Sequence, residues 1–386
     1  MKKYLMIMAV MLTSAALFTA CDDKDNSPKY YPVVVTNGAY VICGGNQSSN
    51  INSSVTYVDY ATKTAAQNQF RAKNNGRQLG LTANDAVVYG SKMYVVVTEE
   101  QTIEVLDAKT LMSLKQIKLT QLAGEVQGFN PRHITAADGK IFVSTYGSSK
   151  ADWDSYTTSG NGYVAAIDTL NYSLAKVYAA GCYPEGVYVF GNSLFVANSD
   201  YSMGQKASIS CIDLQTGVDT PLTNSLIVNP TELAVSNLGV FVLDMGNYSD
   251  IPAGVRLVTA TGATTLFECT HVSFMGTNIY AVNSIYGTIP ENFFVYNIVS
   301  GQKSTFPTGL KGKFFSPNVI EADPITGNIF IASYNENESR PGYANYSSNG
   351  YVLEYSPAGS LLNTYDCGVG PNAIVFNTDV EYVKMN

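Results

Sequence analysis

The sequence predicts an all-β protein, a seven-bladed β-propeller whose last blade is completed by strands from both ends of the chain. Two observations lead to this fold class: a unit of apolar strands that recurs six times, and a seventh copy divided between the termini. Repeats of about 40–50 residues made of short strands are typical of propellers. Length alone would also allow two domains, so the repeat decides the domain count.

One unit recurs along the chain: a turn pair, an apolar strand, a short polar turn, a second apolar strand, a variable loop and a third strand. Successive copies begin 41 to 53 residues apart. Because one sheet cannot bury both of its faces alone, we expect the units to stack around an axis and form one ring-shaped core. Four plain copies, such as NPRHITAADGKIFVSTY, and two weaker ones start at Asn130, Tyr183, Asn229 and Ser316, and at Asn84 and Thr270.

The seventh unit is divided between the two ends of the chain. GAYVICGG from Gly38 and SVTYVDYAT from Ser54 read as its second and third strands, and GPNAIVF from Gly370 reads as its first. Pairing the last segment with the first blade would remove two exposed sheet edges. If the weaker copies are misread, the ring has six or eight blades.

Residues 1–20 are typical of a signal peptide, with Lys2 and Lys3 before an apolar run that is too short to span a bilayer. The following LFTAC resembles a lipobox, although Phe18 departs from the usual aliphatic residue, and it predicts a diacylglycerol on Cys21. An ordinary secretory signal with a chance cysteine is the alternative. We divide the chain into a signal peptide (1–20), a lipidated acidic linker (21–32) and a propeller (33–386).

Charge and cysteine usage narrow the classes of partner. Without the leader, 21 of the 23 Lys and Arg residues remain against 31 Asp and Glu, so nucleic acid and anionic lipid surfaces are poor partners. No later stretch is long and apolar enough to span a membrane, which leaves the lipid as the expected attachment. Buried free thiols, with at most one disulfide and no zinc site, are expected at the widely spaced Cys43, Cys182, Cys211, Cys269 and Cys367.

Aromatic residues gather in the loops after the second strands. In a propeller these loops and the turns into the first strands open on one face, around the central channel. Tyr and Trp combine apolar area with a hydrogen-bonding tip, which suits a broad amphipathic ligand. The set predicts a binding face, although any one member could merely pack loops together: Tyr146, Trp153, Tyr156, Tyr201, Tyr248, Tyr286, Tyr334, Tyr343 and Tyr346.

A second set of candidate ligand contacts occupies the turns into the first strands, at equivalent places in successive blades. We expect these residues to surround the mouth of the channel: Asp85, Arg132, His133, Glu185, Glu232, His271, Asn318 and Asn372. Asn and Asp often satisfy the backbone of turns instead, an alternative that applies above all to the two asparagines.

Signals of catalysis are sparse. His133 and His271 fall in well-separated blades, which disfavours a histidine metal cluster or a catalytic triad. No GxSxG, HExxH, P-loop or Rossmann pattern occurs. Glu185 and Glu232 could act as paired carboxylates, but acidic rim residues more often provide electrostatic lining. We therefore predict a binding protein without a metal or resident cofactor, not an enzyme.

An NPxxI turn, an xGxxFVAN hairpin and a VxxIDLxTG strand recur through residues 33–386, and this pattern resembles the YncE-like propeller lipoproteins of the Bacteroidetes surface. Asp22, Asp23 and Asp25, directly after Cys21, resemble the surface-export signal of such lipoproteins, although a plain solvated linker could have the same composition. Within this group the chain is most similar to the BtuG-type proteins, which capture cobalamin.

The resemblance implies a lipid-anchored outer-membrane protein facing the cell exterior. It would bind cobalamin on the loop face and deliver it to a TonB-dependent outer-membrane transporter. A corrinoid is a large disc with an apolar rim and many amides, which suits Tyr, Trp, Asn and Glu. Stacking aromatics with Asn and Asp also describe sugar sites, so a glycan-binding protein of a polysaccharide uptake system stays open. A lactonase or lyase propeller is the third possibility.

Overall fold

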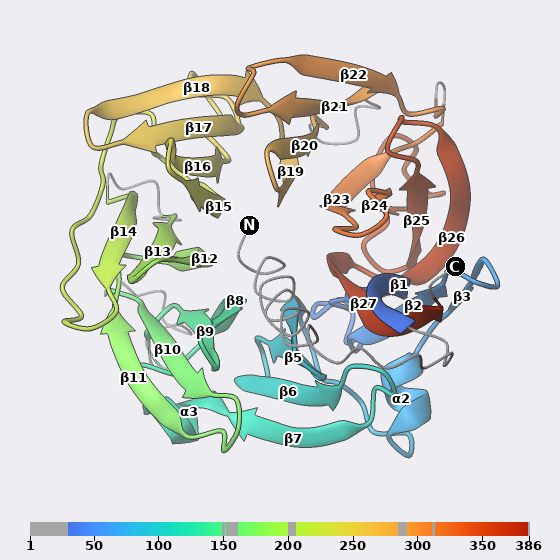
Figure 1. Ribbon diagram of the computed structural model, residues 1–386, viewed down its shortest axis with the longest axis horizontal. Coiled ribbons are helices and arrows are strands. Elements are labelled where there is room, and N and C mark those ends of the chain that lie inside the picture. The colour runs from blue at the N-terminus through green and yellow to red at the C-terminus, as the bar shows by residue number, and fades with distance from the viewer. Residues whose placement is uncertain are drawn as a thin grey trace, which may run out of the picture.

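The computed structural model describes residues 30–148, 151, 161–199, 206–284, 292–310 and 313–384. Within these residues, seven antiparallel sheets stand around a central axis like the blades of a propeller (Figure 1). The predicted all-β ring of seven sheets is confirmed. Cys21, Trp153, Tyr156, Tyr201 and Tyr286 lie outside the described residues.

Five of the sheets consist of four consecutive strands. In the first two their bounds are β4 (Ala83–Tyr89), β5 (Lys92–Val97), β6 (Thr102–Asp107) and β7 (Ser113–Lys118), then β8 (Pro131–Ala137), β9 (Lys140–Thr145), β10 (Tyr163–Asp168) and β11 (Leu174–Ala179). In the next two they are β15 (Pro230–Ser236), β16 (Gly239–Asp244), β17 (Gly254–Thr259) and β18 (Gly262–Glu268), then β19 (His271–Met275), β20 (Asn278–Val282), β21 (Asn292–Asn297) and β22 (Lys303–Pro307). The fifth contains β23 (Ser316–Ala322), β24 (Ile329–Tyr334), β25 (Asn349–Tyr355) and β26 (Leu361–Val369).

One sheet has three named strands, β12 (Pro184–Phe190), β13 (Ser193–Asn198) and β14 (Ser208–Asp213). Isolated bridges from Ile209 to Leu222 and from Ile212 to Asp219 continue it outward. Two helices of five residues each, α2 (Gln69–Lys73) and α3 (Leu119–Ala123), connect neighbouring sheets. The structure thus adds an outer strand to most of the three-stranded units read from the sequence.

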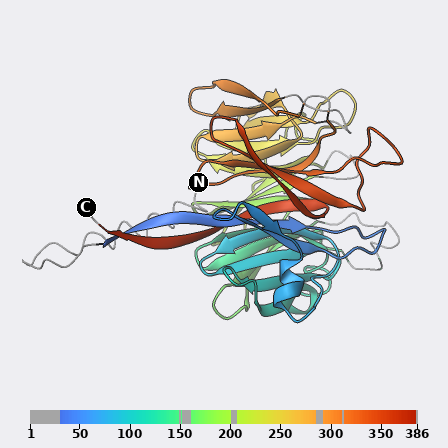
Figure 2. The ribbon, with the colours of Figure 1, turned by 90° about the vertical axis from the view of Figure 1, so that its right-hand side faces the viewer.

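The seventh sheet combines both ends of the described chain, in the order β27 (Pro371–Lys384), β1 (Tyr30–Cys43), β2 (Ser54–Asp59) and β3 (Thr64–Ala66). β1 pairs with β27 in antiparallel register from Tyr30 with Lys384 to Cys43 with Pro371. The outer halves of these two strands leave the ring as a two-stranded ribbon, which extends to the left in Figure 2.

The starts of the inner strands share a local irregularity that positions the channel side chains. Pairing of the first and second strands shifts register just after Pro131, Pro184, Pro230 and Pro317. Pro suits the first residue of a strand because it has no N–H to donate to the ladder. A bulge at this place re-aims the side chains that follow.

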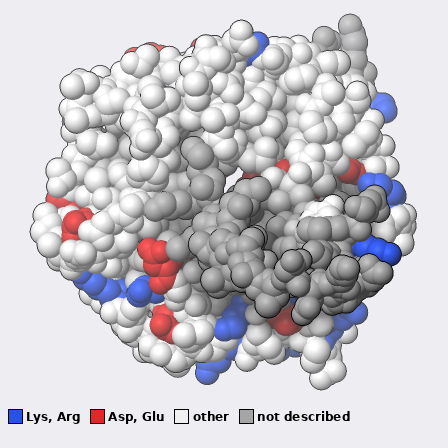
Figure 3. All heavy atoms as spheres, viewed as in Figure 1, with Lys and Arg blue, Asp and Glu red and all other residues white. Residues whose placement is uncertain are grey.

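The core fills the space between neighbouring sheets. Tyr94 of β5, for example, packs in one cluster with Ile141 of β9 and Ile167 of β10, and all three are fully buried. None of the helices in the described part of the chain is long and apolar enough to cross a membrane. On the face seen in Figure 3, the described acidic and basic residues are interspersed, mostly over the lower half of the ring.

Candidate functional site

The inner strands of the seven sheets surround a cavity of about 220 Å³ on the axis of the ring. The inner strands β4, β8, β12, β15, β19, β23 and β27 all start at one end of this channel. Since each second strand is antiparallel to the first, the loops after the second strands lie at that same end. We call this end the loop face; it lies opposite the ribbon of β1 and β27 (Figure 2).

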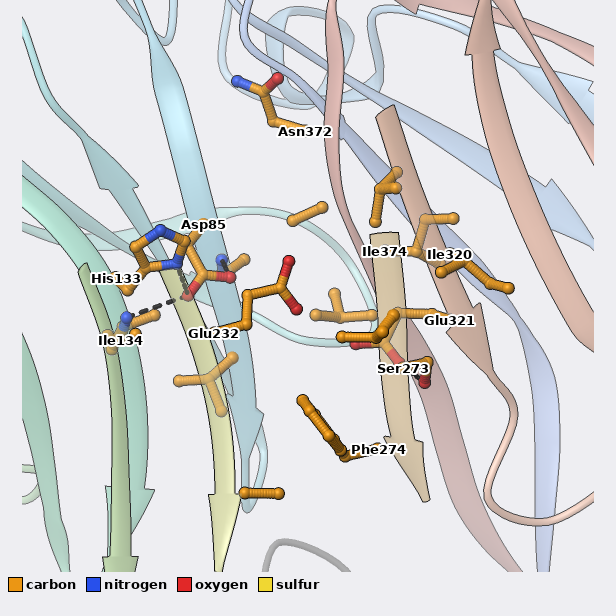
Figure 4. A pocket seen from close by; sticks show the side chains of 18 of the residues that line it. Asp85, His133, Ile134, Glu232, Ser273, Phe274, Ile320, Glu321, Asn372 and Ile374 are labelled. Atoms are coloured by element: carbon orange, nitrogen blue, oxygen red, sulfur yellow. Dashed lines mark hydrogen bonds and ion pairs between the residues drawn. The ribbon is translucent and has the colours of Figure 1, made fainter. Parts of the chain in front are cut away.

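The channel is lined by both polar and apolar side chains. The polar ones lie near the loop face, with Asp85, His133, Glu232, His271, Asn318 and Asn372 at the starts of six inner strands, and Ser273 and Glu321 one step further in (Figure 4). Apolar side chains line the wall between and below these polar groups, among them Val88, Val187, Phe274, Ile320 and Ile374. A small molecule with both polar and apolar groups would match this mixed lining.

The predicted rim residues belong to the inner strands themselves and not to the turns before them. They divide into two groups according to whether they line the cavity. Arg132 and Glu185, directly after the opening prolines of β8 and β12, are not part of the cavity wall, which His133 and Gly186 line instead. The Arg132 and Glu185 side chains pack between neighbouring strands. Asn318 and Asn372, which directly follow Pro317 and Pro371, do border the cavity.

His133 stands between two carboxylates from the neighbouring sheets. Its Nδ1 lies 3.3 Å from Oδ2 of Asp85, and its Nε2 lies 3.2 Å from Oε2 of Glu185. The same Asp85 oxygen accepts a 3.0 Å hydrogen bond from the Ile134 amide. Burial alone would lower the pKa of His133, but the bonds to Asp85 and Glu185 outweigh it and raise that pKa to about 10. The imidazole is therefore a cation at neutral pH.

Glu185 receives two further donors. Nε of Arg132 lies 3.1 Å from its Oε2, and the Tyr146 hydroxyl donates to its Oε1. The Arg132 guanidinium also stacks over the Tyr146 ring, 5.0 Å from the centroid, and Tyr183 meets Tyr146 edge-on at 5.2 Å. Burial alone would raise the pKa of Glu185, but Arg132, His133 and Tyr146 together lower it to about 2. Glu185 is thus a buried carboxylate that is ionised at neutral pH.

Glu232 points into the channel without such partners (Figure 4). Its carboxylate accepts no hydrogen bond from any described residue. Burial is the main reason that its pKa is raised to about 7. The attraction of His133 lowers this pKa, whereas repulsion from Glu321 and Asp85 raises it. At neutral pH this carboxyl is therefore divided between its protonated and ionised forms, and it is the group in the channel most ready to exchange a proton.

On the other side of the channel, His271 and Glu321 hold local hydrogen bonds. Nδ1 of His271 lies 2.9 Å from the Thr270 hydroxyl, and burial lowers the pKa of this histidine to about 4, so it is neutral at pH 7. The Ser273 hydroxyl donates to Oε2 of Glu321 at 2.5 Å. The sequence reading missed Ser273 and Glu321, because both follow the strand starts on which it concentrated.

The two channel asparagines tie strands together. Nδ2 of Asn318 donates to the Pro371 carbonyl at 2.7 Å and lies 3.0 Å from Oδ1 of Asn372, whose own Nδ2 donates to the Ala83 carbonyl at 3.0 Å. This chain of amides links β23, β27 and β4. Both side chains border the cavity, but their hydrogen bonds give them the backbone-satisfying role that the sequence left open.

The described tyrosines of the loop face differ in exposure. Tyr146 is 8% exposed and is committed to Glu185, whereas Tyr248, Tyr343 and Tyr346 are 64%, 50% and 56% exposed. Tyr334 meets Tyr346 edge-on with centroids 4.8 Å apart. An accessible aromatic surface therefore exists on the loop between β24 and β25.

Two loops hold this aromatic surface in place. Nδ2 of Asn46 donates to the Tyr346 carbonyl at 2.8 Å, and the hydroxyls of Ser49 and Ser347 lie 2.8 Å apart. On the outer side, the Arg340 guanidinium lies over the Tyr343 ring at 3.5 Å. Asn46, Ser49 and Arg340 were not among the predicted site residues, since their contribution depends on contacts between loops far apart in the sequence. We call Tyr334, Arg340, Tyr343 and Tyr346 the tyrosine platform.

Within the described residues, no group of three or more His, Cys, Asp and Glu side chains is arranged to hold a metal ion. The channel wall contains a cationic imidazole at His133, which the buried anion Glu185 holds from behind, and a carboxyl at Glu232 that can exchange a proton. What the loop face offers is exposed aromatic area. Both are means of recognising a ligand.

Comparison with known proteins adds fold relatives. A sequence-family profile described as a domain of unknown function, DUF5074, matches residues 37–146. No curated protein matches the sequence. Among solved structures, a hypothetical selenium-binding protein from Sulfolobus tokodaii is similar with a TM-score of 0.58 and 12% identity, over 90% of this chain and 92% of that one.

Two proposed 6-phosphogluconolactonases are similar as well. The protein from Bacteroides uniformis has a TM-score of 0.51 and 12% identity, over 90% of this chain and 100% of its own. The protein from Bacteroides fragilis has the same TM-score and identity, over 88% of this chain and 98% of its own. The likeness is one of fold alone. It supports the propeller and does not transfer a ligand or a reaction.

Proposed function

We propose that this chain is a lipid-anchored surface protein that binds a corrinoid at the loop face and passes it to a TonB-dependent outer-membrane transporter. The observation that carries the proposal is the opposite placement of two features. The described chain starts at Tyr30 on the projecting ribbon, and the tyrosine platform lies at the other end of the propeller. An anchor at Cys21 would leave the platform directed away from the membrane.

The chemistry of the loop face suits a large amphipathic disc. Tyr343 and Tyr346 expose about half of their surface, and the Tyr ring offers apolar area together with a hydroxyl at little cost in side-chain entropy. The channel mouth adds Glu232 and His271 as hydrogen-bonding groups, which match the amides of a corrinoid. The 220 Å³ cavity is too small for the whole disc, so the disc would lie across the mouth.

The test is calorimetric titration of the chain lacking residues 1–21 with cyanocobalamin, with gel filtration to see whether the red ligand co-elutes. We expect one-to-one binding at nanomolar or tighter dissociation constants. No heat and no co-elution would remove the corrinoid from consideration while leaving the propeller intact. Protection against thermal unfolding by a polysaccharide, without any response to cyanocobalamin, would support glycan capture instead.

A further inference from the structure

The sheet that joins the two ends of the chain meets its neighbour along a tightly packed contact, which we call the seam. The seam lies between the sheet of β1, β2, β3 and β27 and the sheet of β23–β26. The Gly45 amide crosses it and donates to the Val369 carbonyl of β26 at 2.9 Å, next to the Gly44 amide, which donates at 2.6 Å to the carbonyl of Gly370 between β26 and β27. The Gly368 amide donates to the Thr56 hydroxyl at 3.2 Å.

Two thiols meet inside the seam. Cys43 ends β1 and Cys367 lies in β26, and both are completely buried in one apolar cluster with Val41 and Val352. The Cys43 thiol donates to the Val41 carbonyl at 3.7 Å, and the Cys367 thiol donates to the carbonyl of its neighbour Gly368 at 3.6 Å. Both are present as thiols in this structure.

Glycine residues permit this close approach. A Cβ at Gly368 would lie 3.1 Å from Cβ and 3.2 Å from Sγ of Cys43, and a Cβ at Gly350 would lie 3.3 Å from Sγ of Cys367. Two of the three other described cysteines lie in different sheets: Cys269 belongs to the cluster around Phe267, and Cys211 lies in β14. The seam pair is thus set apart by position and by contact.

We propose that Cys43 and Cys367 are a disulfide-forming pair that fastens the seam when the chain folds in an oxidising compartment. The oxidant is a disulfide, either of a thiol oxidoreductase or of a small thiol. One cysteine thiolate attacks that disulfide, forming a mixed disulfide and expelling one thiol. The second cysteine then attacks the mixed disulfide, forming the Cys43–Cys367 bond and expelling the second thiol.

In this exchange two electrons pass from the cysteine pair to the oxidant, and the two thiol protons leave with them. Because both sulfurs are fully buried once the seam is closed, the mixed disulfide forms while the seam is still open. The bond would join residues 43 and 367 and so restrict almost the entire propeller in the unfolded state. Such long-range cross-links act chiefly by lowering the entropy of the unfolded chain. The proposal is independent of the ligand.

The decisive experiment is a peptide map of the full chain refolded in a mixture of reduced and oxidised glutathione. The protein is unfolded without reductant, alkylated, digested and analysed by mass spectrometry. We expect one linked pair of peptides containing Cys43 and Cys367, which separates after reduction, and two fewer alkylated thiols than in reduced protein. Alkylation of both cysteines in the non-reduced sample would overturn the proposal.

Thermal unfolding with and without dithiothreitol gives a second measurement. We expect the reductant to lower the midpoint by roughly 5 °C. The difference should vanish in Cys367→Ser and persist in the control Cys269→Ser, which removes a buried thiol elsewhere. If it persists in Cys367→Ser, another source of redox sensitivity must exist and the seam pair is not the cause. The peptide map of the wild-type chain stays decisive even if a serine variant folds poorly.

Discussion

Glu185 and Glu232 lie at the starts of neighbouring inner strands, yet the structure gives them opposite charge behaviour. The strands approach closely: a Cβ at Gly186 would lie 3.0 Å from Cα of Glu232. Glu185 is only 5% exposed and has a pKa of about 2, while the less buried Glu232 has a pKa of about 7. Partners, and not burial, therefore decide which carboxylate is ionised.

The difference comes from the one-residue offset at the strand starts. Glu185 directly follows Pro184 and turns toward Arg132, His133 and Tyr146. Glu232 comes two residues after Pro230 and turns into the cavity. Arg132, His133 and Glu185 thus form a framework of fixed charge beside the entrance of the channel. Glu232 faces the cavity and can change its protonation state. This is a useful division for a binding site, because the framework holds its shape while the ligand meets Glu232.

Removing Arg132 should have the largest effect on this comparison. Arg132→Met leaves Glu185 buried beside one fewer cation, and we expect the free energy of unfolding to fall by about 2–4 kcal/mol. Urea denaturation at pH 7 measures this. The exposed Arg71→Met serves as the control and should change stability by less than about 0.5 kcal/mol. Equal stabilities for the two variants would contradict the framework role of Arg132.

Tyr146→Phe removes the hydroxyl that donates to Glu185 and keeps the ring under Arg132. We expect a loss of about 1.5 kcal/mol. The depressed pKa of Glu185 contributes stability above its ordinary pKa of 4.5, and that stability is lost as the pH falls toward 2. In the variant, the free energy of unfolding should depend less on pH between about pH 5 and about pH 2, as measured by denaturation at a series of pH values. Tyr248→Phe, on an exposed ring, should leave this dependence unchanged.

Glu232→Gln should have the smallest effect, and of opposite sign. Between pH 4.5 and about 7, folded Glu232 holds a proton that the unfolded chain has released, so the free energy of unfolding falls as the pH rises through this window. The amide removes that dependence and should stabilise the protein by roughly 1 kcal/mol at pH 8. Glu268→Gln, on the exposed edge of β18, is the matched control. A destabilised Glu232→Gln at pH 8 would show that the carboxylate has a partner.

The fold could be predicted from the sequence because six copies of the same strand pattern each indicate one blade. The divided seventh unit could also be predicted, since the segments after Gly38, Ser54 and Gly370 keep the alternation of apolar and polar residues that is typical of strands. The outer strands were missed because most of their residues are exposed or only partly buried, so that their apolar alternation is weak. β7, with the sequence SLKQIK, buries only Ile117 fully and gives little apolar alternation.

The candidate site could be predicted from the sequence only in part. The sequence located the strand starts but could not show that Arg132 and His133, adjacent in the chain, would serve different places, since a bulge decides their directions. Nor could it separate Tyr146 from Tyr343, because exposure depends on what packs against each ring. The ion network of Asp85, His133 and Glu185 spans three sheets, and such contacts have no signature in local spacing.

The central claim is that a ligand is held at the loop face, and the most direct test compares tyrosines at the two ends of the propeller. Cyanocobalamin is titrated into the double variant Tyr343→Ser/Tyr346→Ser and into Tyr382→Ser, whose ring is 71% exposed on the opposite ribbon. We expect at least about a tenfold loss of affinity for the first and unchanged affinity for the second. Wild-type affinity in the platform variant, or a loss only in Tyr382→Ser, would contradict the central claim.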